Sequence, residues 1–116
     1  MEHKMEHKIK IVRGTTEPIP IALRKRDGTA YALASGEVVV FGVKKKCEDE
    51  ACLILKTITS LINGVGEIAL TPDDTADLTC GKYVYDVGLK SGANFYNVIP
   101  ASDFVITENV TKWGDA

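Results

Sequence analysis

Hydrophobic and polar residues alternate along most of this chain with the two-residue period of half-buried β-strands. The alternation begins at residues 9–11 and resumes at residues 18–23, whose apolar members are expected to point inward. Pro18 and Pro20 occupy the outward positions there, and proline cannot donate to a ladder, so this stretch is predicted as an edge strand. Residues 37–45 contain V-V-V-F-G-V, which is apolar on both faces and predicts a central strand.

Two dipeptides predict tight turns, because each can place both central residues at positive φ. Asp27-Gly28 is expected to form a hairpin that returns the chain as a short strand over residues 29–33. Asn63-Gly64 carries the same signature between residues 53–59 and residues 65–70. The pattern therefore predicts that the strands on either side of Asn63-Gly64 pair as a hairpin.

The stretch that follows predicts one short helix near residues 72–79. Thr71 is placed to cap it, since its hydroxyl can accept a free amide of the first turn. Pro72 suits the first helical position, and the two aspartates after it suit the positive end of the helix dipole. We expect Leu78 to enter the core from this helix and Gly81 to provide its exit.

The last third of the chain is again β-rich. Residues 82–90 alternate cleanly, Ser91-Gly92 predicts a turn, and residues 95–99 are expected to pair back before Pro100 interrupts them. Residues 104–107 then finish the sheet. Seven or eight strands with a single short helix at the crossover between sheets predict an all-β, immunoglobulin-like antiparallel β-sandwich. A small closed barrel is the alternative architecture.

The spacing Leu78-x-x-Gly81-x-Tyr83 is typical of a tyrosine corner, in which the phenol bonds back to the backbone of the preceding connection. The alternative is a tyrosine that only packs. Tyr85 stands where antibody domains hold a cysteine, so the predicted sandwich lacks an inter-sheet disulfide.

Length and charge narrow the class of protein. The 116 residues fit one domain, which we place at residues 9–111 between a mobile tail of residues 1–8 and a short tail of residues 112–116. The net charge of −2 argues against a nucleic-acid partner, because a phosphate backbone favours a basic surface. The apolar runs are too short to cross a bilayer, and the charged N-terminus predicts folding in a cytoplasm.

No residue pattern predicts catalysis, a cofactor or a metal. The three cysteines are expected to be reduced thiols, with a bridge between Cys47 and Cys52 as the alternative. His3 and His7 would share a face of a helical tail, but two ligands without support make a poor metal site. The chain has no catalytic motif of a serine hydrolase, a zinc protease or a nucleotide-binding enzyme.

Two features are candidates for contact with a partner. Trp113, the only tryptophan, either docks on a partner or closes the end of its own sandwich. Residues 44–46 are lysines and residues 48–50 are acidic, so the loop between them either neutralises itself in solvent or binds a charged partner.

Six segments, in this order, resemble a known family of phage and prophage structural proteins of Gram-positive bacteria. The nearest member is the N-terminal immunoglobulin-like domain of the phage baseplate upper protein. The most specific piece of the resemblance is L-T-P-D-D-T-A-D-L-x-x-G-x-Y-x-Y-D, at residues 70–86. The six segments are R-G-T-T-E-P-I-P-I-A-L (13–23), V-x-F-x-V-K-K (39–45), L-I-L-K-T-I (53–58), G-E-I-A-L-T-P-D-D-T-A-D-L (66–78), G-K-Y-V-Y-D-V (81–87) and F-V-I-T-E-N-V-T (104–111).

The resemblance implies a non-enzymatic virion component, a tail or baseplate adaptor that acts by protein–protein contact. It implies synthesis in the cytoplasm of a bacterial host, incorporation into a virion, and assembly with other tail or baseplate proteins and with copies of itself, but not with nucleic acid or membrane. The alternative function is a small-ligand or carbohydrate-binding β-sandwich, which would need an exposed aromatic platform.

Overall fold

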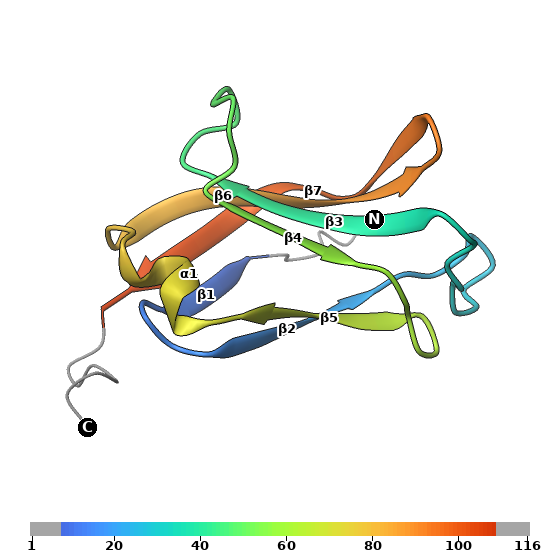
Figure 1. Ribbon diagram of the computed structural model, residues 1–116, viewed down its shortest axis with the longest axis horizontal. Helices are drawn as coiled ribbons and strands as arrows, with labels where there is room; N and C mark the ends of the chain where they lie inside the picture. The colour runs from blue at the N-terminus through green and yellow to red at the C-terminus, as the bar shows by residue number, and fades with distance from the viewer. Residues whose placement is uncertain (1–7, 109–116) are drawn as a thin grey trace, which may run out of the picture.

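The computed structural model describes residues 8–108, which form seven strands and one helix (Figure 1). The elements in chain order are β1 (Ile9–Val12), β2 (Glu17–Ala22), β3 (Glu37–Lys44), β4 (Ile54–Ile58), β5 (Val65–Leu70), α1 (Pro72–Ala76), β6 (Gly81–Ser91) and β7 (Asn94–Thr107).

The strands form two layers, so the predicted all-β sandwich with one short helix is confirmed. A five-stranded sheet has the order β1-β7-β6-β3-β4, and a two-stranded sheet pairs β2 with β5. Figure 1 shows the smaller sheet beneath the larger one, with α1 at one end where the chain crosses between them. The sandwich is not antiparallel throughout, because β1 runs parallel to β7. No hairpin joins these two strands, so no turn imposes the antiparallel direction on the pair.

The core lies between the two layers and follows the period-2 pattern of the sequence. Phe41, Tyr85 and Phe104 pack at its centre, with ring centroids 5.5–6.2 Å apart. Ile19 and Ile21 of β2 face them from the smaller sheet and are almost fully buried. Pro18 and Pro20 point outward, as predicted for an edge strand, and deprive the open side of β2 of two backbone donors.

The predicted hairpin between β4 and β5 is wrong, although its turn is present. Asn63 and Gly64 adopt φ values of +52° and +80°, and Ile62 exchanges backbone hydrogen bonds with Val65 across them. However, β4 pairs only with β3, and β5 pairs only with β2. Residues 59–61 carry the chain from one layer to the other, and Gly64 accepts a 2.8 Å hydrogen bond from the amide of Leu23 beyond the end of β2.

The return strand predicted over residues 29–33 is also wrong. The chain turns here, but not as predicted: Gly28 has a positive φ of +91° and Asp27 does not, and the Gly28 amide donates to the Lys25 carbonyl at 2.9 Å, so Arg26 and Asp27 are the central residues of the turn. The pairing that follows is limited to a single bridge between Arg24 and Ala30. Glu37 then draws the chain away, since its carboxylate accepts hydrogen bonds from the Tyr31 hydroxyl at 2.8 Å and from the amide of residue 34 at 2.9 Å.

Pro100 does not end a strand, contrary to prediction, because β7 continues through it. The register between β6 and β7 shifts twice close to Val87, which faces Ile99, so the ladder is irregular beside Pro100. A bulge leaves a residue without its ladder partner, and a proline that lacks an amide hydrogen is tolerated at such a position.

Candidate functional site

The helix cap predicted at Thr71 and Pro72 lies at the crossover between the sheets. Thr71 and Asp74 form a capping box, in which the Asp74 carboxylate accepts the Thr71 amide at 2.7 Å and the Thr71 hydroxyl at 3.2 Å. The Lys56 ammonium lies 3.0 Å from the same carboxylate and ties the helix to β4. Burial opposes ionisation of Asp74, but the hydrogen bond from Thr71 and the charge of Lys56 outweigh it and lower its pKa.

The residues of the predicted tyrosine corner meet beside this helix. The Tyr83 hydroxyl donates to the carbonyl oxygen of Thr79 at 2.7 Å, and the Tyr83 side chain is 3% exposed. Gly81 has a φ of +145°, which places the chain on entry to β6. Leu78, half-buried, packs against the core from the turn after α1 rather than from the helix itself. Together these residues hold the crossover in place, which is a structural role.

Sequence reasoning missed a second anchor of this corner. Thr75 is 1% exposed, and its hydroxyl oxygen accepts a 2.8 Å hydrogen bond from the amide of Gly14, in the turn between β1 and β2. The helix is thereby joined to the first strands of the fold. A polar residue on the core side of a short helix was the only sequence signal for this contact.

Other residues singled out by sequence bear less on function. Trp113, His3 and His7 lie outside the described residues. Cys47 and Cys52 are exposed thiols with no bridge between them, and Cys80, also without a disulfide, donates to the Glu108 carboxylate at 3.0 Å. Within residues 8–108, no cluster of three or more histidine, cysteine or acidic side chains is arranged to hold a metal ion. No helix in that range is long and apolar enough to span a membrane.

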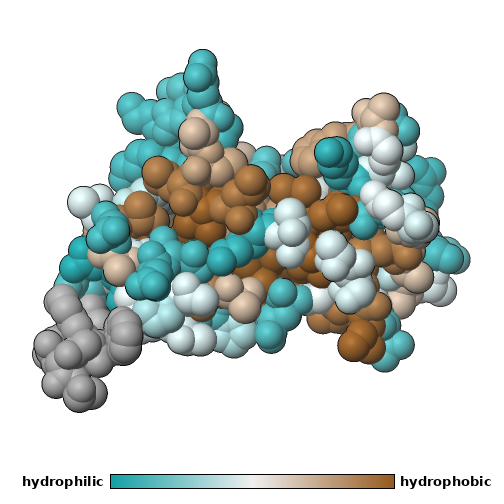
Figure 2. Space-filling model, in the orientation of Figure 1, coloured by the Kyte–Doolittle hydropathy of each residue, from teal (hydrophilic) through white to brown (hydrophobic). Residues whose placement is uncertain are grey.

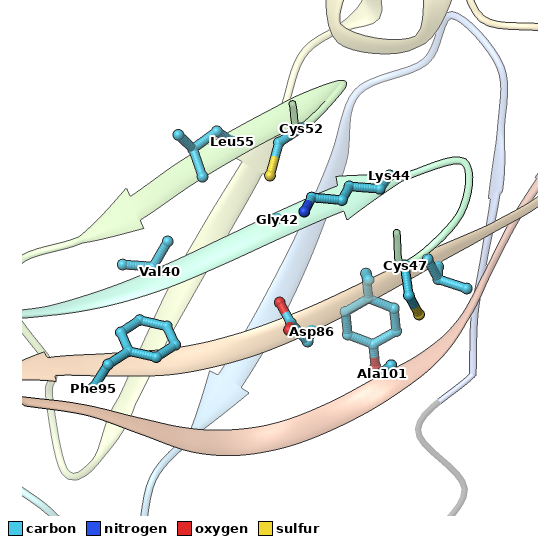
Figure 3. A pocket seen from close by; sticks show the side chains of 11 residues that line it. Val40, Gly42, Lys44, Cys47, Cys52, Leu55, Asp86, Phe95 and Ala101 are labelled. Carbon is cyan, nitrogen blue, oxygen red and sulfur yellow. The ribbon is translucent and has the colours of Figure 1, made fainter. Parts of the chain in front are cut away.

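The feature best suited to binding is a groove of about 240 Å³ on the outer face of the five-stranded sheet (Figure 3). It lies over β3 and β6, with β4 on one side and β7 on the other. Its lining is mainly apolar and consists of Val40, Gly42, Lys44, Cys47, Cys52, Leu55, Val84, Tyr85, Asp86, Phe95 and Ala101.

Two glycines shape the groove. A Cβ on Gly88 would lie 2.2 Å from the Phe95 ring, so only glycine leaves space for this ring to lie across β6. A Cβ on Gly42 would lie 3.0 Å from the Cys52 sulfur, so the floor of the groove is low at that point too. Phe95 and Leu55 form apolar walls and are each 60% exposed. An exposed aromatic and an exposed leucine beside an apolar floor are typical of a binding surface.

Two opposite charges lie in this apolar lining. Asp86 faces Gly42 across the β6–β3 ladder, and Lys44 faces Val84 one step further along. Figure 3 shows the Lys44 side chain extending back along β3 toward Gly42. Among residues 8–108, neither Lys44 nor Asp86 forms a salt bridge. Both charges are therefore available to an incoming group.

A second hollow lies between the sheets, near the turn that leads into β5, with Ile62 and Val65 at its edge. Figure 2 shows hydrophobic atoms along the strip between β4 and β5 and at that turn. Ile62 is 79% exposed and Val65 is 41% exposed. No charged pair comparable to Lys44 and Asp86 lines this hollow within the described range, so it offers less basis for specific recognition.

Sequence reasoning placed β3 correctly in the middle of its sheet but missed the groove. The inner residues Val39, Phe41 and Val43 are fully buried, as expected. On the outer face, Val40 and Gly42 are only half-buried, because no layer covers them. The apolar run with a central glycine was the available signal.

Comparison with protein-family models finds no match for this chain, and comparison with curated proteins finds no significant similarity.

Proposed function

We propose that this protein is a non-enzymatic structural component of a phage or prophage virion, a tail or baseplate adaptor that acts by protein–protein contact. Its partners are other tail or baseplate proteins and further copies of the chain. On this proposal the protein is made in the cytoplasm of the bacterial host and then enters the virion. The resemblance of residues 8–111 to the baseplate domain supports the virion role.

The exposed apolar walls of the groove, Leu55 and Phe95, are the observation that carries the protein-binding role. Each keeps 60% of its surface in solvent, beside the half-buried Val40 and Val84. Covering such a face with a partner removes apolar surface from water at roughly 25 cal/mol per Å². Aromatic side chains such as Phe95 are enriched in the buried cores of protein interfaces.

The groove favours a protein partner over a sugar or a drug-sized ligand. Its volume of about 240 Å³ is below the roughly 300–1,000 Å³ of ordinary small-molecule sites. Phe95 is the one well-exposed aromatic ring among its lining residues, whereas the other ring, Tyr85, is 3% exposed and belongs to the core. A sugar platform built from a single ring would be small.

The polar groups around the groove also fit binding better than catalysis. Asp86, Lys44 and two thiols are its reactive side chains, and the lining that residues 8–108 provide contains no histidine. A nucleophile needs a base within hydrogen-bond reach and a third group that orients the base. The pair Lys44 and Asp86 instead resembles the charged rim that sets orientation in an interface.

The proposal is tested by co-expressing the full chain with the proteins encoded beside its gene and capturing the complexes. We expect a co-encoded tail or baseplate protein to be retained by the wild type. Leu55→Glu should reduce its recovery at least tenfold, whereas Ile62→Glu should not, because Ile62 is an apolar site away from the groove that is more exposed than Leu55 (79% against 60%). Circular dichroism shows whether both variants are folded. Failure to retain any co-encoded structural protein would overturn the virion role, and equal loss with Ile62→Glu would overturn the groove as the contact.

A further inference from the structure

The outer face of the two-stranded sheet is apolar, although no other element of residues 8–108 covers it (Figure 1). An antiparallel sheet with one face in water normally carries polar side chains on that face. Here the six outward residues of β2 and β5, all exposed, are Pro18, Pro20, Ala22, Val65 and Ala69 with the single charged residue Glu67. We call these six residues the proline face. A contiguous exposed apolar surface of this kind marks a site of interaction.

Two opposite charges lie at symmetric positions about the centre of the proline face. Glu67 is the ladder partner of Pro20, which lies two residues before the pair formed by Ala22 and Val65. Arg24 lies two residues after Ala22, so it points to the same side of the strand, and it is exposed. Within residues 8–108, neither Glu67 nor Arg24 forms a salt bridge. Both charges are therefore available to a partner.

We propose that the proline face binds the same face of a second copy of this chain through a two-fold axis. The axis lies in the plane between the two faces and crosses the strands at Ala22 and Val65. It lays β2 against β2 of the second copy, and β5 against β5, in opposite directions. This inference rests on the proposed function, because it states how copies of the adaptor contact one another while the groove stays free for other proteins.

The symmetry brings the two charges together twice. Positions two residues before and two residues after the axis face each other, so Arg24 of one copy lies over Pro20 of the other. Glu67 is beside Pro20 on the neighbouring strand. Neighbouring strands are about 4.8 Å apart and packed sheets about 10 Å apart, a gap that the long arginine and glutamate side chains bridge. Because a two-fold contact is self-complementary, Glu67 of each copy pairs with Arg24 of the other.

The prolines favour this packing of faces over the addition of strands at the edge of β2. Pro18 and Pro20 have no amide hydrogen, so another strand cannot form a regular ladder with the open edge of β2. A contact between faces needs no backbone donor. The short side chains of proline and alanine also let the two backbones approach closely. The two residues that block the edge therefore supply apolar surface to the face.

The size of the proline face determines the strength of the contact. Six residues of a strand span roughly 20 Å and two strands roughly 10 Å, so the face covers on the order of 200 Å² per copy. A stable interface buries roughly 800 Å² per partner. The contact is therefore weak between free copies, and it becomes effective when other contacts hold several copies close together.

Nuclear magnetic resonance of the full, isotope-labelled chain tests the contact residue by residue. We expect the amide resonances of β2 and β5 to shift progressively as protein concentration rises to the millimolar range, whereas those of Val40 and Asp86 in the groove stay constant. Ala22→Lys should abolish these shifts, because it places two lysines opposite each other at the axis. Lys90→Glu is the control, since Lys90 is exposed on the larger sheet and its reversal should leave the shifts intact.

Exchanging the charges tests the two-fold arrangement. Glu67→Arg and Arg24→Glu should each weaken self-association at least fivefold in sedimentation equilibrium, because like charges then meet twice in every pair. An equimolar mixture of the two variants should recover association, since a mixed pair has an arginine opposite a glutamate at both positions. Added salt should weaken association of the wild type, because it screens the same pairs.

Three results would overturn the inference. Resonances of β2 and β5 that are independent of concentration would show that copies do not meet at the proline face, including the case in which a different protein covers it. Shifts confined to the groove would place the contact between copies on the larger sheet. A mixture of the two charge variants without recovery would exclude the two-fold arrangement. None of these results depends on capture of a co-encoded protein, so failure of the virion role and failure of this contact remain distinguishable.

Discussion

Replacing Tyr83 with phenylalanine removes the two hydrogen bonds of its hydroxyl and leaves the rest of the corner unchanged. The Tyr83 hydroxyl donates to the Thr79 carbonyl at 2.7 Å and lies 3.2 Å from the Thr79 hydroxyl. The ring is buried in the core, and the Lys45 ammonium lies 4.4 Å from its centre. Phenylalanine retains the burial and the contact with Lys45. The substitution therefore measures the hydrogen bonds of the corner alone.

The surroundings of Thr79 set the expected magnitude. A neutral hydrogen bond contributes about 0.5–1.5 kcal/mol net, and a buried partner left unsatisfied costs about 1–3 kcal/mol. Thr79 is exposed, so water replaces the lost phenol at its carbonyl oxygen. The loss should therefore lie near 1 kcal/mol rather than 3 kcal/mol. For a domain of this size, a loss of about 1 kcal/mol lowers the melting temperature by roughly 4–8 °C.

Equilibrium unfolding in urea, followed by circular dichroism in the far ultraviolet, measures this loss. We expect the midpoint of Tyr83→Phe to fall by roughly 0.5–1 M with an unchanged slope, since the slope reports the surface exposed on unfolding. Tyr96→Phe provides the matched control, because Tyr96 is 54% exposed on the β6–β7 hairpin. Equal midpoints for the wild type and Tyr83→Phe would refute the corner as a stabilising contact. An equal loss in the control would assign the effect to hydroxyl removal in general.

Three further predictions concern stability. Because the folded-state pKa of Asp74 is lowered, the stabilisation that its carboxylate provides is present above the ordinary pKa of 3.8 and is lost as pH falls below it. Asp74→Asn should therefore lower the free energy of unfolding by about 1 kcal/mol at neutral pH. Denaturant melts should show the difference between wild type and variant shrinking in acid, whereas a constant difference would exclude titration of Asp74 as the cause. Gly88→Ala should displace the Phe95 ring, which lies 2.2 Å from the position of the new Cβ. In a double-mutant cycle, the loss of stability caused by Gly88→Ala should be smaller when Phe95→Ala is also present. Losses that simply add in the double variant would contradict the contact between Gly88 and Phe95. Gly64→Ala should destabilise the domain by about 2 kcal/mol, since φ is +80° and the new Cβ would lie 2.7 Å from a backbone oxygen. Gly36→Ala is the control, because Gly36 has a φ of +85° but open space around it, and it should cost less in thermal melts. An equal cost for the two variants would show that the backbone strain, and not the close contact, causes the loss.

Local patterns predicted most of the elements. Residues 65–70 and 81–91 alternate, and each forms a strand whose inward side chains lie in the core, among them Ile68 and Leu70 of β5 and Tyr83 and Tyr85 of β6. The Thr-Pro-Asp-Asp sequence predicted the start of α1, and the Leu-x-x-Gly-x-Tyr spacing predicted the hydrogen bond that Tyr83 makes. These features depend on neighbours a few residues apart, so the chain displays them without its tertiary context.

Pairing between strands was less predictable, because it depends on which surfaces meet. Asn63-Gly64 forms the predicted turn, yet it connects two layers instead of two neighbouring strands. The dipeptide specifies a reversal of direction, but not the plane in which the chain continues. Pro100 likewise excludes a regular ladder position, but only the irregular pairing of β6 with β7 shows that the strand continues past it.

The sequence by itself therefore determined an all-β chain, its turns, its helix cap and the inward face of each strand, because backbone sterics and the period of two act locally. Only the tertiary structure decided that β1 lies parallel to β7 and that the outer face of β3 is left without a covering layer. The groove arises from that uncovered face, where Gly88 admits the Phe95 ring from another strand. Its members come from four strands and one loop, so no single stretch of sequence contains the site.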